Sequence, residues 1–250
     1  MAWSALWQWL LTPLSGQMEH VIAGAVAWHG RLMVAGWNIL VPFGVLIARF
    51  FKIAPRQNWP QHLDNKAWWH CHLFMQQTGF ALAIVALALL LFFGPTLPEG
   101  PVATAHATAG WALLVAGLAQ ILSGRLRGTK GGPTAAVFKG DHYFMTRRRV
   151  MFERFHKSVG WLSMPLTFVA TMLGLFLADA PRWMPLVILT WWSLLTFAFV
   201  VLQKRGMCID TYQAIWGADP SLPGNRRKPI GWGIRRYNSN RSPTEQKARQ

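Results

Sequence analysis

Residues 67–93 read AWWHCHLFMQQTGFALAIVALALLLFF and contain no acidic or basic side chain. A helix rises about 1.5 Å per residue, so this run is long enough to cross the hydrocarbon core of a bilayer. Four similar apolar blocks lie at about 21–51, 102–122, 150–177 and 183–202, and no β-strand pattern is seen. The sequence therefore predicts an all-α polytopic membrane protein with five transmembrane helices.

The chain is strongly basic, with 25 lysines and arginines against nine acidic residues. These cations lie in the loops and the C-terminal tail, where they set topology and meet anionic lipid, so we expect a lipid bilayer and no nucleic acid as partner. The two cysteines, Cys71 and Cys208, are both expected on the cytoplasmic side, which argues against a disulfide. No C-x-x-C-H motif occurs, which excludes covalently attached haem.

The loops differ in charge. The loop after the first block has basic residues within it and at its edges, whereas residues 94–101 contain no lysine or arginine. The loop between the third and fourth blocks is richly basic, and the next turn contains only Arg182. By the positive-inside rule, the N-terminus lies outside and the C-terminus in the cytoplasm.

The blocks divide the chain into four parts. Residues 1–20 are Trp-rich but too short to span, which favours an interfacial segment. Residues 21–180 form a four-helix core, whose first helix should kink at Pro42. Residues 181–203 add a fifth transmembrane helix. Residues 204–250 form a basic cytoplasmic tail, whose Pro, Gly, Asn and Ser content argues against a packed domain.

Four histidines lie at matched depths in the core. His29 is 20 residues from Arg49, and His106 is 19 from Arg125, which places both about 30 Å from the cytoplasmic boundary. His72 and His156 lie about 10 Å from the same boundary. Antiparallel helices therefore bring together an outer pair (His29 and His106) and an inner pair (His72 and His156).

Each pair suits the two axial positions of a haem held in the core of a helix bundle. We expect two haem b groups, with irons about 19 Å apart along the membrane normal. Both axial positions of each iron would be filled, which predicts electron transfer rather than substrate binding at iron. Glycines on the same faces, Gly36, Gly110 and Gly160, could leave room for a porphyrin or for a neighbouring helix.

Other polar residues near the pairs have more than one interpretation. His70 points to a different helix face from His72 and could meet a haem propionate or solvent. Arg31, near the outer pair, could neutralise a propionate, attract an anionic donor or snorkel to the surface. On the inner side, propionates or an anionic acceptor could be served by Arg49, Lys66, Arg147 and Arg149. The remaining histidines are interpreted as ordinary interface or loop residues: His20, His62 and His142.

Several short motifs together resemble the cytochrome b561 family, specifically the core that also occurs attached to DOMON domains. The matching stretches cover residues 25–180 and are His29-Gly30-Arg31-Leu32-Met33 with Pro42, Gly44 and Arg49, Trp68-Trp69-x-x-His72 with Gln76, Gly79 and Phe80, His106-x-x-x-Gly110-Trp111 with Gln120, and His156-x-x-x-Gly160. The resemblance implies two haem b groups on the same histidine pairs. It also implies an ascorbate- or quinol-type electron donor, with a ferric chelate or a radical as acceptor.

Three functions are weighed. The first is a di-haem transmembrane oxidoreductase that passes single electrons between a small-molecule or protein donor and acceptor. The second is a cytochrome b subunit that links a partner dehydrogenase to the quinone pool. The third, a histidine-lined metal or proton transporter, is disfavoured because the spans hold almost no carboxylate. The composition and short N-terminal segment indicate a bacterial protein, and hence the inner membrane.

Overall fold

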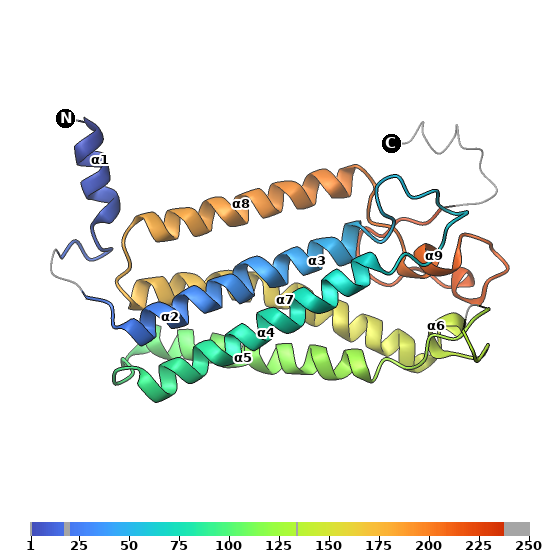
Figure 1. Cartoon of the computed structure of the whole chain (residues 1–250), viewed down its shortest axis with the longest axis horizontal. Coiled ribbons are helices and arrows are strands. Elements are labelled where there is room, and N and C mark those ends of the chain that lie inside the picture. The colour runs from blue at the N-terminus through green and yellow to red at the C-terminus, as the bar shows by residue number, and fades with distance from the viewer. Residues whose placement is uncertain (1, 18–20, 134, 238–250) are drawn as a thin grey trace. The chain divides into compact units, whose positions relative to one another are not determined.

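The computed structural model describes residues 2–17, 21–133 and 135–237, and the calls on His20 and residues 238–250 fall outside these ranges. In the described part the structure is helical, without named strands (Figure 1). The elements in chain order are α1 (Ala2–Leu11), α2 (Gly24–Met33), η1 (Val34–Leu40), α3 (Val41–Phe50), α4 (Ala67–Phe93), α5 (Pro101–Arg125), α6 (Asp141–Phe144), α7 (Arg147–Leu177), α8 (Trp183–Lys204), α9 (Thr211–Trp216) and η2 (Pro223–Arg226).

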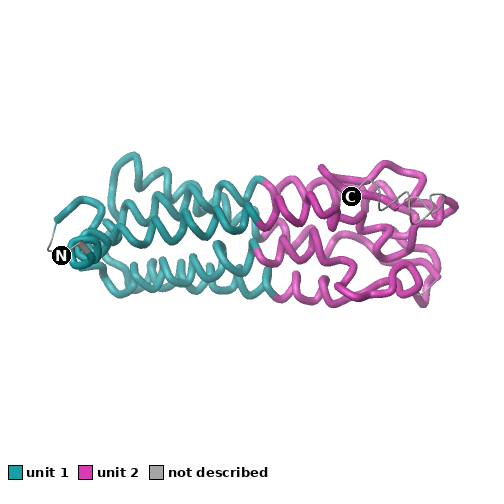
Figure 2. The backbone as a smooth tube through the Cα atoms, turned by 90° about the horizontal axis from the view of Figure 1, so that it is seen from above, with its two compact units in different colours: residues 1–42, 75–117, 162–197 teal, residues 43–74, 118–161, 198–250 magenta. Residues whose placement is uncertain are grey.

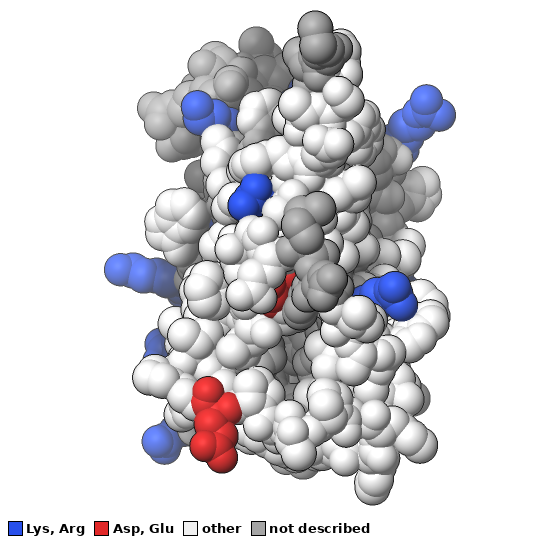
Figure 3. Space-filling view, turned by 90° about the vertical axis from the view of Figure 1, so that its left-hand side faces the viewer, with Lys and Arg blue, Asp and Glu red and all other residues white. Residues whose placement is uncertain are grey.

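Five helices in the described ranges are long and apolar enough to cross a membrane, which confirms the predicted fold class. They are Gly24–Phe50, Ala67–Phe93, Pro101–Arg125, Arg147–Leu177 and Trp183–Lys204. Their ends lie within a few residues of the predicted ones. The space-filling view in Figure 3 shows scattered charged side chains on an otherwise mostly uncharged surface.

The first span changes helix type before its proline. Residues Val34–Leu40 form a π-helix between α2 and α3, and the N–H of Val41 donates to the carbonyl of Gly36, five residues earlier. Pro42 follows inside this continuous span, and its missing N–H leaves the carbonyl of Asn38, four residues earlier, to accept instead from the indole of Trp191. The irregularity expected at Pro42 is therefore a widened turn that precedes it.

The chain divides into two compact units (Figure 2). Unit 1 comprises residues 1–42, 75–117 and 162–197, and unit 2 comprises residues 43–74, 118–161 and 198–250. The outer histidine pair belongs to unit 1 and the inner pair to unit 2. Each unit therefore contains one complete candidate site.

Unit 1 has an apolar core with a polar contact inside it. The core includes Trp37, Leu113 and Ala170. Asn38 is fully buried; its amide oxygen accepts from the indole of Trp192, and its backbone carbonyl accepts from the indole of Trp191. These two tryptophans belong to α8, so the fifth span is fastened to the π-helical segment.

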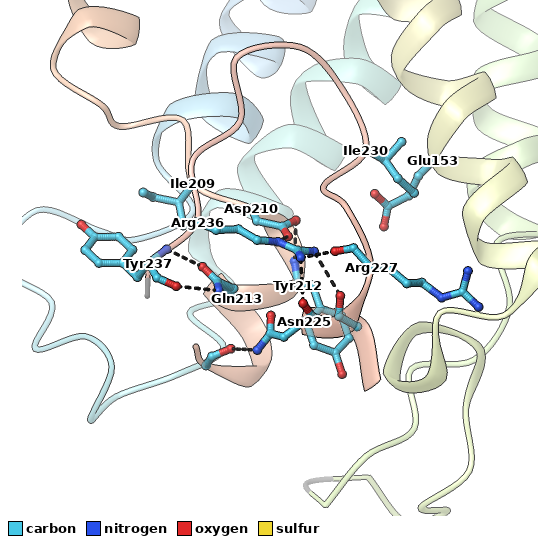
Figure 4. A network of polar contacts seen from close by, with 12 residues as sticks. Glu153, Ile209, Asp210, Tyr212, Gln213, Asn225, Arg227, Ile230, Arg236 and Tyr237 are labelled. Atoms are coloured by element: carbon cyan, nitrogen blue, oxygen red, sulfur yellow. Dashed lines mark hydrogen bonds and ion pairs between the residues drawn. The ribbon is translucent and has the colours of Figure 1, made fainter. Parts of the chain in front are cut away.

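Unit 2 contains a folded C-terminal region, so the expectation of an unpacked tail is wrong for residues 204–237. Tyr212 and Trp216 of α9 pack with Tyr143 and Met145 in a second apolar core. Arg236 pairs with Asp210 and donates to backbone carbonyls of the η2 segment (Figure 4). Composition suggested disorder because it does not record this network of one buried ion pair and several aromatic rings.

Candidate metal centres

The outer pair is held between α2 and α5. The ring centroids of His29 and His106 lie 6.3 Å apart, with their planes at 75°. His29 Nδ1 donates to the carbonyl of Ala86 at 3.1 Å, and His106 Nδ1 donates to that of Ala170 at 3.0 Å. A carbonyl can only accept, so Nδ1 carries the ring proton and the Nε2 lone pair is free to bind a metal.

Gly174 of α7 makes room for the ring of His106. A Cβ atom at position 174 would lie 2.9 Å from Cε1 of His106 and 3.3 Å from its Nδ1. Any side chain there would therefore displace the imidazole. The sequence analysis did not single out Gly174, because nothing in the local sequence distinguishes it from a helix-packing glycine.

The inner pair is held between α4 and α7 with similar geometry. The ring centroids of His72 and His156 lie 6.1 Å apart, with their planes at 75°. His72 Nδ1 donates to the carbonyl of Gly44 at 3.0 Å. Nδ1 of His156 is buried and has no hydrogen-bond partner among the residues that the structure describes.

Both separations fit two axial ligands of one metal. A metal–imidazole bond of about 2.0 Å, with about 1.1 Å from each nitrogen to its ring centroid, places two axial ring centroids about 6.2 Å apart. The observed values are 6.3 and 6.1 Å. Within the described ranges, no group of three or more His, Cys, Asp or Glu side chains could hold a bare metal ion.

The three predicted glycines differ in what they meet. A Cβ at Gly36 would lie 2.6 Å from the carbonyl oxygen of Gly79, so this glycine permits a close helix crossing. A Cβ at Gly110, one turn after His106, would meet nothing within 4 Å. A Cβ at Gly160 would lie 3.4 Å from Nε2 of Gln120. Of the three, only Gly110 has open space where a Cβ would lie.

Four of the predicted polar residues lie in three different settings. Arg31 is exposed and stacks on Trp28. Arg49 lies over several aromatic rings, including Trp161, and donates to Gln203 and to the carbonyl of Trp232. It therefore fastens the C-terminal region to the ends of the spans. The other two, Lys66 and His70, line a cavity in unit 2.

This cavity has a volume of about 290 Å³, and its lining is mainly cationic and aromatic; its acidic residue, Asp64, is paired with Lys130. Its lining includes Lys66, Trp68, Trp69, His70, Arg127, Lys130, His142 and Arg149. The Trp69 ring lies 6.3 Å from that of His72, and Arg127 lies 4.0 Å over Trp69. Burial lowers the pKa of Arg127, and the nearby charge of Arg149 lowers it further. Such a cationic cavity suits an anionic ligand.

His142 is a residue that the sequence analysis undervalued. It is 4% exposed and lies against Tyr212 and Trp216, so it is no ordinary loop histidine. Burial lowers its pKa to about 3, and the charge of Arg149 acts in the same direction. Its neighbours Tyr143 and Phe144 were the available sign that this loop segment packs inward.

The carboxylate near the start of α7 is already neutralised. Glu153 is 5% exposed and forms ion pairs with Arg149 at 3.1 Å and Lys157 at 2.7 Å. A carboxylate held by two cations is a poor ligand for a passing cation. The arrangement therefore gives no support to a transport pathway through this residue.

Comparisons with known proteins give relatives of one kind. The chain is 28% identical to a cytochrome b561, DM13 and DOMON domain-containing protein of Arabidopsis thaliana, over 66% of the chain and 16% of the relative. It is 25% identical to a cytochrome b561 and DOMON domain-containing protein of the same plant, over 74% of the chain and 43% of the relative.

A third relative is ferric-chelate reductase 1 of Bos taurus, which is 31% identical over 47% of the chain and 19% of the relative. The chain thus spans less than half the length of each of these relatives. No protein-family model matches the chain, and no solved structure matches it.

Proposed function

We propose that this chain, a homologue of the cytochrome b561 proteins, holds two haem b groups and passes single electrons across a membrane. His29 and His106 would hold one haem, and His72 and His156 the other. The observation that carries the proposal is the spacing of each imidazole pair, 6.3 and 6.1 Å between centroids. Bound haem would supply a one-electron ferric–ferrous couple.

The protein's own contribution is to orient the imidazoles. Backbone carbonyls of Ala86, Gly44 and Ala170 fix three of the four rings in the tautomer that presents Nε2. Each haem would be held by two imidazoles, so it would supply electron transfer rather than substrate binding at iron. Donor and acceptor would therefore exchange electrons at the protein surface and not at iron.

The cationic cavity of unit 2 is the proposed exchange site on the inner side. Lys66, His70 and Arg127 would attract an anionic redox partner or a haem propionate, and Trp69 would connect the cavity to His72. On the outer side, Arg31 would have the corresponding role. An ascorbate- or quinol-type donor with a ferric-chelate or radical acceptor fits these charges, and one relative has the name ferric-chelate reductase.

A second source of electrons is a partner dehydrogenase acting with the quinone pool. The observation that favours it is the folded C-terminal region, which exposes three consecutive cations, Arg226, Arg227 and Lys228. Such a surface suits docking of an acidic protein.

We place the chain in the inner membrane of a bacterium, with the N-terminus outside and the C-terminal region in the cytoplasm, because the loops on the cytoplasmic side are basic.

The test is the haem content of the purified protein, measured as the pyridine haemochrome, in the original chain and in His106→Ala and His156→Ala. We expect about two haems b per chain, falling towards one in each variant. His62→Ala, an exposed loop substitution, is the matched control and should retain both. A well-folded protein without haem would refute the proposal, and loss in only one of the two variants would reduce it to a single-haem cytochrome.

A further inference from the structure

The four candidate ligands are not fastened alike. Nδ1 of His29, His72 and His106 each donates to a backbone carbonyl of another helix, at 3.0 to 3.1 Å. A backbone carbonyl is present whatever the side chain, so these three hydrogen bonds are insensitive to substitution. His156 differs, because its buried Nδ1 has no partner among the described residues.

A buried acceptor without a partner belongs to Gln120, which contacts the backbone of His156. Gln120 of α5 donates from Nε2 to the backbone carbonyl of His156 at 2.8 Å. The amide oxygen Oε1 of the same Gln120 is buried and lacks a partner in the described part of the chain. Gln120 thus contacts the backbone of His156, and each of these two residues has one buried polar side-chain atom without a partner in the described part of the chain, which is rare and costly in native proteins.

The orientation of the Gln120 amide follows from its contacts. If the amide were turned over, Oε1 would face the carbonyl oxygen of His156, and two acceptors would oppose one another. Nε2 must therefore be the atom on that carbonyl, which leaves Oε1 as the free acceptor. Gly160 makes the position available, since a Cβ there would already lie 3.4 Å from Nε2 of Gln120.

We infer that Gln120 is the positioning residue of His156: its Oε1 accepts, through one buried water, the hydrogen bond that Nδ1–H of His156 donates. A buried water commonly bridges such a pair of polar atoms. The bridge would keep the proton on Nδ1 and Nε2 free for the metal, as the carbonyls do for the other three ligands. His156 of the inner site would then be the candidate ligand whose basicity depends on the side chain of another residue, Gln120.

The inference rests on the proposed function and predicts how the reduction potential of the inner haem responds to substitution of Gln120. An acceptor on Nδ1–H makes the imidazole more electron-rich, which stabilises the ferric state and lowers the reduction potential. Gln120→Leu removes the acceptor and should raise the potential of the inner haem. The outer haem should keep its potential in this variant.

The experiment is a spectroelectrochemical titration of the purified full chain, with the inner component assigned from the His106→Ala variant. For Gln120→Leu we expect about a tenfold change in the reduced-to-oxidised ratio at a fixed potential, which corresponds to about 59 mV for one electron. The low-spin electron paramagnetic resonance signal of the inner haem should shift with it. Haem content should remain at two per chain.

Gln76→Leu is the matched control. Gln76 also donates from Nε2 to a helix carbonyl, that of Val41 at 2.9 Å, but it faces no unpaired imidazole nitrogen in the described residues. Equal potentials for Gln120→Leu and the original chain would overturn the inference, as would an equal shift in Gln76→Leu. An original chain that binds no haem would instead refute the proposed function.

Discussion

Gly174 offers a sharp test of whether the outer pair holds a metal. In Gly174→Ala the new Cβ would lie 2.9 Å from Cε1 of His106, whereas ordinary contacts begin at 3.4 Å. The imidazole must therefore move by about 0.5 Å, and metal–ligand distances tolerate only about 0.2 Å. The ring is also tied to the carbonyl of Ala170 at 3.0 Å, so a shift that relieves the clash strains that hydrogen bond.

We expect Gly174→Ala to lose much of the haem held by the outer pair while it retains the inner haem. Substitution of a residue that holds a metal ligand in place typically lowers metal affinity 10- to 100-fold. The assay is the haem content per chain together with a reductive titration, in which the amplitude of one of the two components should decrease. Helix content and monodispersity should not fall, because alanine is a better helix former than glycine by about 1 kcal/mol.

Gly24→Ala is the control for this prediction, since a Cβ at position 24 would meet nothing within 4 Å. It should retain both haems. If Gly174→Ala also retains both, with an unchanged outer potential, His106 is not constrained as the structure indicates. The assignment of the outer pair would then fail, whatever the inner pair does.

Two further predictions concern the parts of the molecule around the histidine pairs. Asn38→Leu removes the side-chain hydrogen bonds to Trp192 of α8 and Thr171 of α7. At roughly 0.6 kcal/mol for each bond in a membrane, the loss should weaken the packing of α7 and α8 on the first span by about 1 kcal/mol in total, seen as a lower thermal midpoint and a shifted tryptophan emission without loss of haem. His142 should make the C-terminal region acid-sensitive, because its pKa is about 3 when buried and near 6.5 when released. The released state therefore binds the extra proton. The free energy of unfolding falls as the pH drops below about 6.5, by up to about 1.4 kcal/mol per pH unit. Hydrogen exchange of α9 at pH 7 and pH 5 measures this, and His142→Gln should abolish the pH difference.

The sequence was sufficient for the spans and for the choice of paired histidines. Both depend on quantities that a linear sequence contains, namely the length of apolar runs and the number of residues between a histidine and the next basic boundary. His29 and His106 face one another because their depths match, and the same holds for His72 and His156. Helix geometry converts those counts into positions with little ambiguity.

The sequence was insufficient wherever the deciding partner is a backbone atom or a distant ring. Nothing in the sequence indicates that the carbonyls of Ala86 and Ala170 receive the histidine protons, because every residue has a carbonyl. The folded C-terminal region was missed for a related reason. Tyr212 and Trp216 pack against a loop about 70 residues earlier, and that contact outweighs an unfavourable composition.

The difference between a backbone partner and a side-chain partner bears on how the reduction potentials of the two proposed haems could differ. The outer ligands are both fastened by carbonyls within unit 1, so their hydrogen bonds persist under substitution. In the inner pair only His72 is fastened in this way, and His156 depends on its surroundings in unit 2. Those surroundings also hold Arg149, Glu153 and Lys157 in one buried ion-pair group. Substitutions near the inner pair should therefore change the reduction potential of a haem held there more readily than substitutions near the outer pair change that of the other haem.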